Sequence, residues 1–386
     1  MKPYLLKFLV CPVDHQELLL RIFSQKKREL SPEHGDQIAS RGFNLAEFEV
    51  EIEHGVLLNP RKKFAFPIYN GVPRLLVFEH PLLKVFRSEF IQECATLAQE
   101  GFQFPNNQSV PGETSVLKSF SREWTDYGFS QDAYWGQTAE TYNSSLFATL
   151  HNENQELKHK VVIEVGIGSG GSAEEMARRF ECNLIGVDLG YSVDVAYKYF
   201  GASPFLHIVQ ASVFNLPFQD ERFDFVYSHG VIHHTHNTKK AFEKLSRLAC
   251  KGGRLYIWVY SHINEARTLN RKLIMLLETL IRPWCSRLPG WLQTIVLQPI
   301  VPLYIFHQNA TVDQQPGKAK YSWREALHAA RDRFTPLYIH RHSEEEVSAW
   351  FKSGGFSKIK ALSGKELPDF VPVGFYMNTG VEGFKL

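Results

Sequence analysis

The chain has 386 residues, 44% of them hydrophobic, which is enough for an α/β domain of roughly 200 to 250 residues and a smaller module. Its 43 Lys and Arg residues nearly balance its 41 Asp and Glu residues, which argues against an obligatory nucleic-acid partner. The five cysteines form no C-x-x-C pair, which excludes a disulfide scaffold and an intact zinc ribbon and favours a cytoplasmic location. Lys7 interrupts the apolar N-terminus, so we expect no secretory signal there.

Residues 1–78 are expected to form a small β-rich module, because short apolar runs alternate with prolines. The stretches "LLKFLVCPVDHQELLL" (5–20) and "FPIYNGVP" (66–73) resemble the small zinc-ribbon proteins that partner and activate methyltransferases. In that family Cys11 would be the first of four zinc ligands. Asp14 replaces the second cysteine and the later pair is missing, which leaves Cys11 with at most Asp14, His15 or His54 as further candidate ligands. Since tetrahedral zinc needs four ligands, we expect a metal-free module that docks a partner or covers the substrate.

Residues 79–145 are expected to form a helical and aromatic connector. Helical periodicity is visible in "LLKVFRSEFIQECATLAQ" (82–99), and a polar loop and an aromatic stretch follow. The stretch contains Trp124, Tyr127, Tyr134 and Trp135. These rings either cover a pocket or pack the connector onto the next domain.

Residues 146–262 are expected to form the cofactor-binding core. Strand patterns such as "KVVIEVG", "NLIGVDL", "FLHIVQAS", "FDFVYSHG" and "RLYIWVY" alternate with helical patterns such as "SAEEMARRF", "SVDVAYKYF" and "NTKKAFEKLSRLA". This alternation predicts an α/β fold with a doubly wound, mostly parallel, Rossmann-like sheet of seven strands. Ligand sites of such sheets lie at the carboxyl ends of the strands.

The glycine loop "VVIEVGIGSGG" (161–171) fits both the G-x-G-x-x-G of dinucleotide-binding domains and the E-x-G-x-G-x-G of methyl-donor domains. Glu164 lies two residues before Gly166, where its carboxylate would repel a pyrophosphate. S-adenosylmethionine has no phosphate, is cationic, and carries a ribose diol that a carboxylate binds through two hydrogen bonds. Asp188 is placed for that diol, although a domain that binds NAD would also have an acid there.

The residues downstream favour the methyl donor. "LPF" (216–218), "FDFV" (223–226), "VIHH" (231–234) and "KGG" (251–253) resemble, in order and spacing, the class I S-adenosylmethionine-dependent methyltransferases. The resemblance implies S-adenosylmethionine as cofactor and the following binding residues: Glu164, Gly166, Gly168, Gly170, Asp188, Leu189, Ser212, Val213 and His229. The chain departs from the family at Ala211-Ser212, where an Asp usually meets the adenine amino group. A Ser hydroxyl can accept that hydrogen bond less strongly.

The histidine-rich stretch "SHGVIHHTHN" (228–237) supplies candidate catalytic residues. His233 and His234, together with the later His340, are candidates for proton removal. The same histidines could instead line the cleft, cap a helix or bind a metal, and we expect no metal because no acidic motif accompanies them.

Residues 263–330 are expected to form a helical lid, and residues 331–386 the rest of the sheet. Basic residues interrupt the apolar stretch 261–306, so no run reaches the roughly 18 residues of a spanning helix. The segment could cover a hydrophobic acceptor, touch a membrane surface through 263–306, or simply pack. Ser343 and Glu346 predict a capped helix, and "FSKIKALS" and "FVPVGFYMNTG" are expected to be the sixth and seventh strands.

These patterns predict a methyltransferase that moves the sulfonium methyl group to an O, N or C nucleophile of a small or lipophilic metabolite. Because the donor is already activated, alignment of the reacting atoms should dominate catalysis. Two alternatives are a non-catalytic scaffold that binds S-adenosylmethionine and an NAD-dependent oxidoreductase, which Glu164 disfavours. The sequence does not set the oligomeric state.

Overall fold

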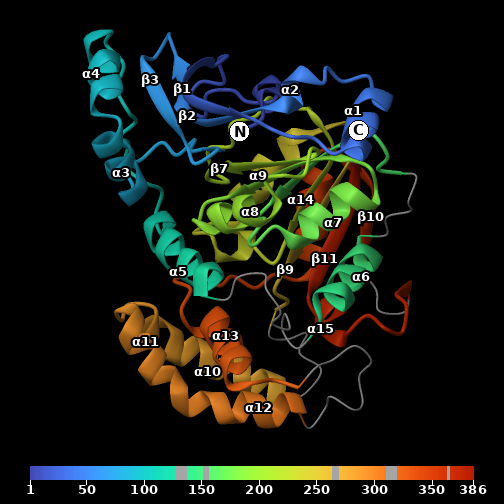
Figure 1. Cartoon of the computed structure of the whole chain (residues 1–386). Helices are drawn as coiled ribbons and strands as arrows, with labels where there is room; N and C mark the ends of the chain where they lie inside the picture. Colours follow the sequence, from blue (N-terminus) through green and yellow to red (C-terminus); the bar gives the residue numbers. More distant parts are fainter. Residues whose placement is uncertain (127–136, 151–155, 263–268, 310–319, 363–365) are drawn as a thin grey trace.

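The computed structural model describes residues 1–126, 137–150, 156–262, 269–309, 320–362 and 366–386. Two sheets lie next to each other, and a helical unit lies at the end of the molecule opposite the N-terminal sheet (Figure 1). The aromatic residues Tyr127, Tyr134 and Trp135 lie outside the described residues, and the side chain of Trp124 is not described.

The N-terminal module is β-rich, as its sequence predicts. Its four strands are antiparallel in the order β1-β2-β3-β4. Asn70 and Gly71 both have positive φ angles, as a tight two-residue turn between β3 and β4 requires. The elements are η1 (Pro3–Lys7), β1 (Leu19–Lys27), α1 (Pro32–Ser40), α2 (Ala46–Glu49), β2 (Val50–Asn59), β3 (Phe64–Tyr69) and β4 (Val72–Pro73).

Among the described residues, four helices connect this module to the core. The predicted helical stretch forms α3 (Pro81–Glu89) and α4 (Ile91–Gln99), and α5 (Glu113–Asp126) and α6 (Ala139–Thr149) follow. Helix α5 packs on α8 (Ser192–Phe200), and α6 packs on α7 (Gly171–Arg179). The connector therefore reaches the end of the core sheet where ligands are expected.

The core sheet has seven strands in the order β10-β11-β9-β8-β5-β6-β7. The five strands from β9 to β7 are parallel, whereas β11 is antiparallel to both of its neighbours. The strand order reverses between β5 and β8, which makes that point the expected ligand crevice. The strands are β5 (Val161–Val165), β6 (Asn183–Asp188), β7 (Leu206–Gln210), β8 (Phe223–His229), β9 (Ala249–Val259), β10 (Phe356–Ala361) and β11 (Thr379–Lys385).

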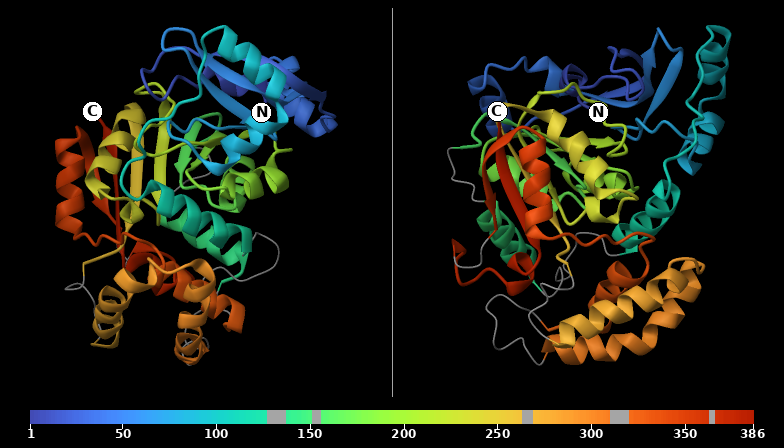
Figure 2. Two further views of the ribbon diagram at one scale, coloured as in Figure 1. Left: turned by 90° about the vertical axis from the view of Figure 1, so that its left-hand side faces the viewer. Right: turned by 180° about the vertical axis from the view of Figure 1, so that it is seen from behind.

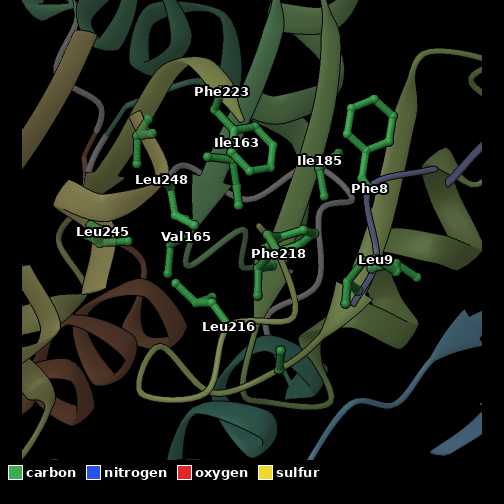
Figure 3. Packing of buried hydrophobic residues seen from close by; sticks show 14 of the residues in the cluster. Phe8, Leu9, Ile163, Val165, Ile185, Leu216, Phe218, Phe223, Leu245 and Leu248 are labelled. Atoms are coloured by element: carbon green, nitrogen blue, oxygen red, sulfur yellow. The ribbon is translucent and has the colours of Figure 1, made fainter. Parts of the chain in front are cut away.

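Alternate residues of each parallel strand pack against opposite layers. Val162 on one face of β5 joins a core with α6, α7 and α8, whereas Ile163 on the other face joins α9 (Thr238–Leu248) and α14 (Glu344–Ser353). The views in Figure 2 show these layers on both sides of the sheet. Phe8 and Leu9 of the N-terminal module belong to the second core, beside Phe218 (Figure 3). The module and the core sheet therefore share one hydrophobic core.

The C-terminal segment corrects one prediction. Residues 356–361 form the sixth strand as expected, but most of "FVPVGFYMNTG" is not a strand, because α15 (Val373–Tyr376) lies within it. The seventh strand, β11, begins only at Thr379 and pairs with β9. The apolar run is buried by a short helix instead, where Phe375 is only 5% exposed and its carbonyl accepts a hydrogen bond from Trp258 Nε1 (2.6 Å). At Gly383 of β11 a Cβ atom would lie 2.9 Å from Phe351, so the true strand needs a residue with low strand propensity.

The helical unit consists of α10 (Leu269–Cys285), α11 (Gly290–Leu297), η4 (Gln298–Ile300), α12 (Val301–Asn309) and α13 (Trp323–Phe334). Helices α10, α11 and α12 all pack on α13. Within the described ranges, no helix is both long enough and apolar enough to cross a membrane.

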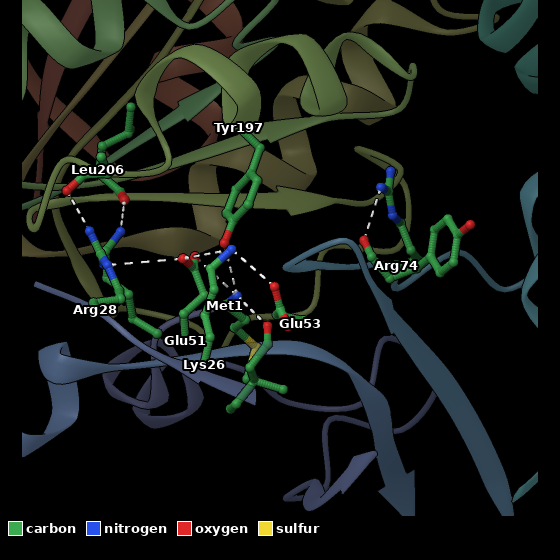
Figure 4. A network of polar contacts seen from close by, with 12 residues as sticks. Met1, Lys26, Arg28, Glu51, Glu53, Arg74, Tyr197 and Leu206 are labelled. Carbon is green, nitrogen blue, oxygen red and sulfur yellow. Dashed lines mark hydrogen bonds and ion pairs between the residues drawn. The ribbon is translucent and has the colours of Figure 1, made fainter. Parts of the chain in front are cut away.

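A polar network joins the N-terminal module to the edge of the core sheet (Figure 4). Arg74 is 1% exposed, and its guanidinium donates to Asp194 of α8 and to Gln210 Oε1 at the end of β7 (3.0 Å). The backbone N–H of Leu75 donates to the Gln210 carbonyl (2.8 Å), so the segment after β4 also bonds to the edge strand. Nearby, Lys2 Nζ donates to the Leu206 carbonyl (2.8 Å).

Replacement of Arg74 by Met is expected to lower the free energy of unfolding by roughly 2 to 4 kcal/mol, because buried hydrogen bonds between the two units are lost. Urea denaturation measures this loss. The matched control is Arg21→Met, since the Arg21 pair with Glu100 is exposed and should contribute under about 1 kcal/mol. Equal effects of the two substitutions would contradict a stabilising role of the Arg74 network.

Candidate active site

The glycine turn after β5 forms the floor of the candidate site. Gly166, Gly168 and Gly170 all have positive φ angles, and Gly170 is the N-cap of α7. A Cβ atom at Gly166 would lie 2.1 Å from a methyl group of Val231, which follows β8. The turn therefore passes close to the loop after β8, at the point where the strand order reverses.

Glu164 lies on β5 and is buried. Its side chain accepts a hydrogen bond from the Tyr227 hydroxyl of β8 (2.7 Å), and the residue is 7% exposed. Burial raises the pKa of Glu164 to about 8, the hydrogen bond from Tyr227 lowers it, and the nearby Asp188 carboxylate raises it again. The free protein therefore holds Glu164 mostly protonated at neutral pH, whereas a cation beside it would favour the carboxylate.

Asp188 ends β6, next to the glycine turn. Its two carboxylate oxygens accept backbone N–H groups, one from Gly168 (3.0 Å) and one from Gly190 (2.8 Å). Burial raises the pKa of Asp188, and these hydrogen bonds lower it. Each oxygen keeps a further lone pair, so the carboxylate can accept the two hydroxyls of a ribose diol.

Ser212, which follows β7, contacts a carboxylate that the sequence analysis missed. The Ser212 hydroxyl donates to Glu113 Oε1, and the second Glu113 oxygen accepts the Val110 N–H (2.7 Å). Glu113 is 4% exposed, and burial raises its pKa. This carboxylate comes from α5 of the connector and lies at the strand end where the related family has an Asp.

Helix α5 covers the ends of β6 and β7. Leu189 packs in a small cluster with Leu117 of α5, and the backbone N–H of Tyr191 donates to Ser121 Oγ (2.7 Å). Val213 is partly buried and packs on the core below. Helix α5 thus contacts the residues that follow β6 through Leu117 and Ser121, and the residue Ser212 after β7 through Glu113.

His229 ends β8 and lies against aromatic rings. Its imidazole stacks on Trp258 with ring centroids 4.5 Å apart, and burial lowers its pKa to about 3. Its Nδ1 has no hydrogen-bond partner among the described residues. The His229 imidazole is therefore neutral, and its Nδ1 is buried in this structure.

The three candidate catalytic histidines lie together. The ring centroids of His233 and His234 are 4.1 Å apart. The backbone N–H of His340 donates to the backbone carbonyl of His233 (2.9 Å). His234 Nδ1 lies 3.1 Å from the Tyr338 carbonyl, so Nδ1 carries the proton and Nε2 is the acceptor. Burial lowers the pKa values of all three imidazoles. Within the described ranges, no group of three or more His, Cys, Asp or Glu residues is arranged to hold a metal ion.

Cys11 of the N-terminal module lies in a hydrogen-bonded turn. Its Sγ accepts the Val13 N–H (3.5 Å), and the neighbouring Asp14 accepts a hydrogen bond from Asn59 Nδ2 (2.7 Å). The Asn59 side chain in turn accepts the backbone N–H groups of the loop after β2. Hydrogen bonds therefore close this loop at the position where the sequence resemblance would place metal ligands.

Comparison with known protein families is consistent with this geometry. Residues 163–257 match the methyltransferase domain family, and residues 2–71 match the Trm112p-like protein family. The chain is 30% identical over 165 residues to the chloroplastic tocopherol O-methyltransferase of Arabidopsis thaliana, covering 39% of this chain and 45% of that protein. It is 26% identical over 210 residues to a sterol 24-C-methyltransferase of Gibberella zeae, and this match covers 47% of this chain and 55% of that protein. The chain thus spans about half the length of these curated relatives.

Two solved structures are similar over most of the chain. A complex of the Haloferax volcanii Trm112 methyltransferase activator matches with a TM-score of 0.40 and 14% identity, covering 72% of this chain and 99% of that chain. The magnesium protoporphyrin IX methyltransferase of Synechocystis PCC 6803 with bound S-adenosylhomocysteine matches with a TM-score of 0.43 and 15% identity, covering 71% and all of that chain (100%).

The sheet order, the glycine turn and the domain match define a class I methyltransferase fold. The match to the methyltransferase domain family covers residues 163–257, and a match to the Trm112p-like protein family lies in front of it on the same polypeptide. S-adenosylmethionine is the cofactor of such domains, and the residues present fit it. A side chain at Gly166 would close the turn, and the carboxyl groups of Glu164 and Asp188 suit a cationic donor with a diol.

Replacement of Gly166 by Ala is expected to lower the free energy of unfolding by roughly 2 kcal/mol or more and to abolish cofactor binding. The new Cβ would clash with Val231 at a φ of +100°. Thermal shift with and without S-adenosylhomocysteine measures both effects. Gly252→Ala is the control, because Gly252 also has a positive φ but open space around it. Intact ligand binding by Gly166→Ala would contradict the proposed turn geometry.

Proposed function

We propose that the protein transfers the methyl group of S-adenosylmethionine to an O, N or C nucleophile of a small or lipophilic metabolite. The observation that carries the proposal is the pair of acidic side chains beside the glycine turn at the ends of adjacent strands, the buried Glu164 and the partly buried Asp188. A diphosphate there would be repelled whenever either carboxyl group is ionised, whereas a sulfonium and an ammonium group would favour the ionised form and be attracted to it. The named relatives act on tocopherol and sterols, which supports a lipophilic acceptor.

In this proposal Asp188 binds the ribose diol, Glu164 faces the cationic end of the donor, and the glycine turn admits the backbone close to it. Glu113 and Ser212 together accept the adenine amino group, since Ser212 alone is a weak acceptor. The bound cofactor supplies an activated methyl group, and the chain supplies alignment.

His234 is the proposed proton acceptor among the three histidines. Its Nδ1 proton is held by the Tyr338 carbonyl, which leaves the Nε2 lone pair for a substrate proton. Its lowered pKa keeps the imidazole neutral, so a rate that depends on it should fall only in acid. His340 and His233 then position this ring rather than remove the proton.

His234→Gln is expected to lower kcat by about a hundredfold while leaving the affinity for S-adenosylhomocysteine unchanged. The rate of the remaining activity should lose the acidic limb of its pH profile. The control is His236→Gln, because His236 lies on the same loop against Phe214 and is not in the cluster. An unchanged kcat and pH profile would contradict the assignment of His234.

The function itself is tested with purified protein, S-adenosylmethionine labelled in its methyl group, and a lipid and metabolite extract. Methyl transfer predicts a labelled product that Glu164→Gln abolishes. Binding of S-adenosylhomocysteine without any labelled product would instead favour a non-catalytic scaffold. Thermal stabilisation by NADH alone would favour an oxidoreductase. A cytoplasmic location stays a prediction, and the five cysteines, all free in the structure, support a reducing compartment.

A further inference from the structure

Helix α10 exposes apolar residues on its outer side and buries a charged residue on its inner side, together with the apolar Met275 and Cys285. Glu278 on its inner side is 1% exposed and forms ion pairs with Arg333 of α13 (2.7 Å) and Arg341 (2.5 Å). Its outer side carries Leu276, Leu280 and Trp284 at four-residue spacing, all at least half exposed. A surface helix ordinarily turns its charged residues to water and its apolar residues inward. The outer side of α10 is therefore built for a non-aqueous contact.

The next two helices also expose apolar residues. Trp291 and Ile295 of α11 and Leu303 and Phe306 of α12 are all more than half exposed. Because α10, α11 and α12 pack on α13, their exposed sides form the outer surface of the helical unit. This unit lies at the end of the molecule away from the Trm112p-like domain (Figures 1 and 2). We call these seven residues, Leu276, Leu280, Trp284, Trp291, Ile295, Leu303 and Phe306, the apolar outer surface.

Residues 269–309, which form α10 to α12, carry a positive net charge. Residues 269–309 contain four Arg and Lys residues but a single acid, Glu278, which is the buried one. Arg287, between α10 and α11, is exposed. Tryptophan prefers the boundary between lipid headgroups and acyl chains, and basic residues are attracted to anionic headgroups. A large apolar surface with tryptophans and a positive net charge matches the surface of an anionic bilayer.

We propose that the apolar outer surface docks the protein on an anionic lipid bilayer without crossing it. The membrane contact does not depend on which acceptor is methylated. It adds a binding surface to the proposed function and no chemical step. It also gives the predicted lid a second role. An acceptor dissolved in the bilayer would meet the helical unit before it reached the cofactor site.

The test uses flotation of the full-length protein with vesicles of phosphatidylcholine alone or with phosphatidylglycerol added. The wild type should bind the anionic vesicles more tightly, and Arg287→Glu should weaken this by about fivefold or more. A triple variant with Trp284→Ser, Trp291→Ser and Phe306→Ser should bind the anionic vesicles about a hundredfold more weakly than the wild type. The matched control is Leu19→Ser, Ile91→Ser, Tyr199→Ser, which removes exposed apolar residues elsewhere.

Each outcome decides the proposal. No vesicle binding by the wild type, or equal binding by the wild type and the Trp284, Trp291 and Phe306 variant, overturns it. If ultracentrifugation shows a dimer that this variant dissociates, and vesicles stay unbound, the surface binds a second copy instead. Binding of S-adenosylhomocysteine, measured on the same samples, shows that the variants are folded. It also separates failure of membrane docking from failure of the proposed methyl transfer.

Discussion

At alkaline pH the ligand-free Glu164→Gln variant is expected to be more stable than the ligand-free wild type. Its affinity for S-adenosylmethionine should be lower by about a hundredfold or more. Burial holds the pKa of Glu164 at about 8 in the folded protein, against 4.5 ordinarily. Between these two values the folded state binds more protons than the unfolded chain does, so Glu164 makes stability fall as pH rises through this window. An amide cannot ionise, and its oxygen can still accept the Tyr227 hydrogen bond.

The rise of the Glu164 pKa from 4.5 to about 8 sets an upper bound of about 5 kcal/mol on the gain in unfolding free energy that Glu164→Gln can give above pH 8. Urea denaturation of the wild type and of Glu164→Gln at pH 6 and pH 8.5 measures this gain. The difference in unfolding free energy between the two proteins should be larger at pH 8.5. The matched variant is Tyr227→Phe, which removes the hydrogen bond that lowers the Glu164 pKa. It should raise that pKa further and weaken cofactor binding less than Glu164→Gln does.

The same carboxyl predicts a pH dependence of binding in the wild type. Affinity for the cationic donor should rise from pH 6 to pH 8, as Glu164 loses its proton more readily, and this rise should be absent in Glu164→Gln. Isothermal titration in two buffers of different ionisation enthalpy counts the protons released. If the variant binds S-adenosylmethionine as tightly as the wild type, the electrostatic basis of the proposed cofactor site is wrong.

The sequence predicted the core because its information there is local. Runs of Val and Ile alternate with amphipathic helices, and strand ends in a parallel sheet meet at one edge, so Glu164 and Asp188 had to approach each other. The failure at the seventh strand has the opposite cause. Its apolar run is buried by a short helix, whereas the true strand contains Gly380 and Gly383 and looks weak by propensity.

The contacts between units were not predictable, because no local pattern encodes them. Arg74 stands alone in the apolar run "GVPRLL", and a single charge there could equally lie at the surface. Its burial follows from Asp194 and Gln210, which come from α8 and β7. The apolar outer surface of α10 shows the same limit. Its periodicity predicts a helix, but only the structure shows that Glu278 faces inward.

Glu113 is the site residue with the weakest signal in the sequence. It lies 99 positions before Ser212, in a stretch "VPGETS" that is typical of a loop, and it is the first residue of α5. The only indication was the missing acid at Ala211-Ser212, since an adenine amino group still needs a strong acceptor there. In the proposed site Glu113 of the connector takes the place of that acceptor, and the connector has no counterpart in the motif.

Glu113→Ala is therefore expected to weaken S-adenosylhomocysteine binding by about ten- to a hundredfold, since a hydrogen bond to a charged group contributes about 1.5 to 3 kcal/mol. The diagnostic readout is selectivity. S-inosylhomocysteine carries an oxygen in place of the adenine amino group, so wild-type Glu113 should repel it, and the Ala variant should bind the two ligands almost equally.

Calorimetry with both ligands checks this result, and Ser212→Ala is the matched variant because it removes the hydroxyl but keeps the carboxylate. That variant should lose less affinity than Glu113→Ala and should keep most of the discrimination. If Glu113 only caps its own loop through the Val110 N–H, both ligands will weaken together in Glu113→Ala and the selectivity will not change. In that case the adenine would be held by Ser212 and by the carbonyls around Leu189, and α5 would act as a cover alone.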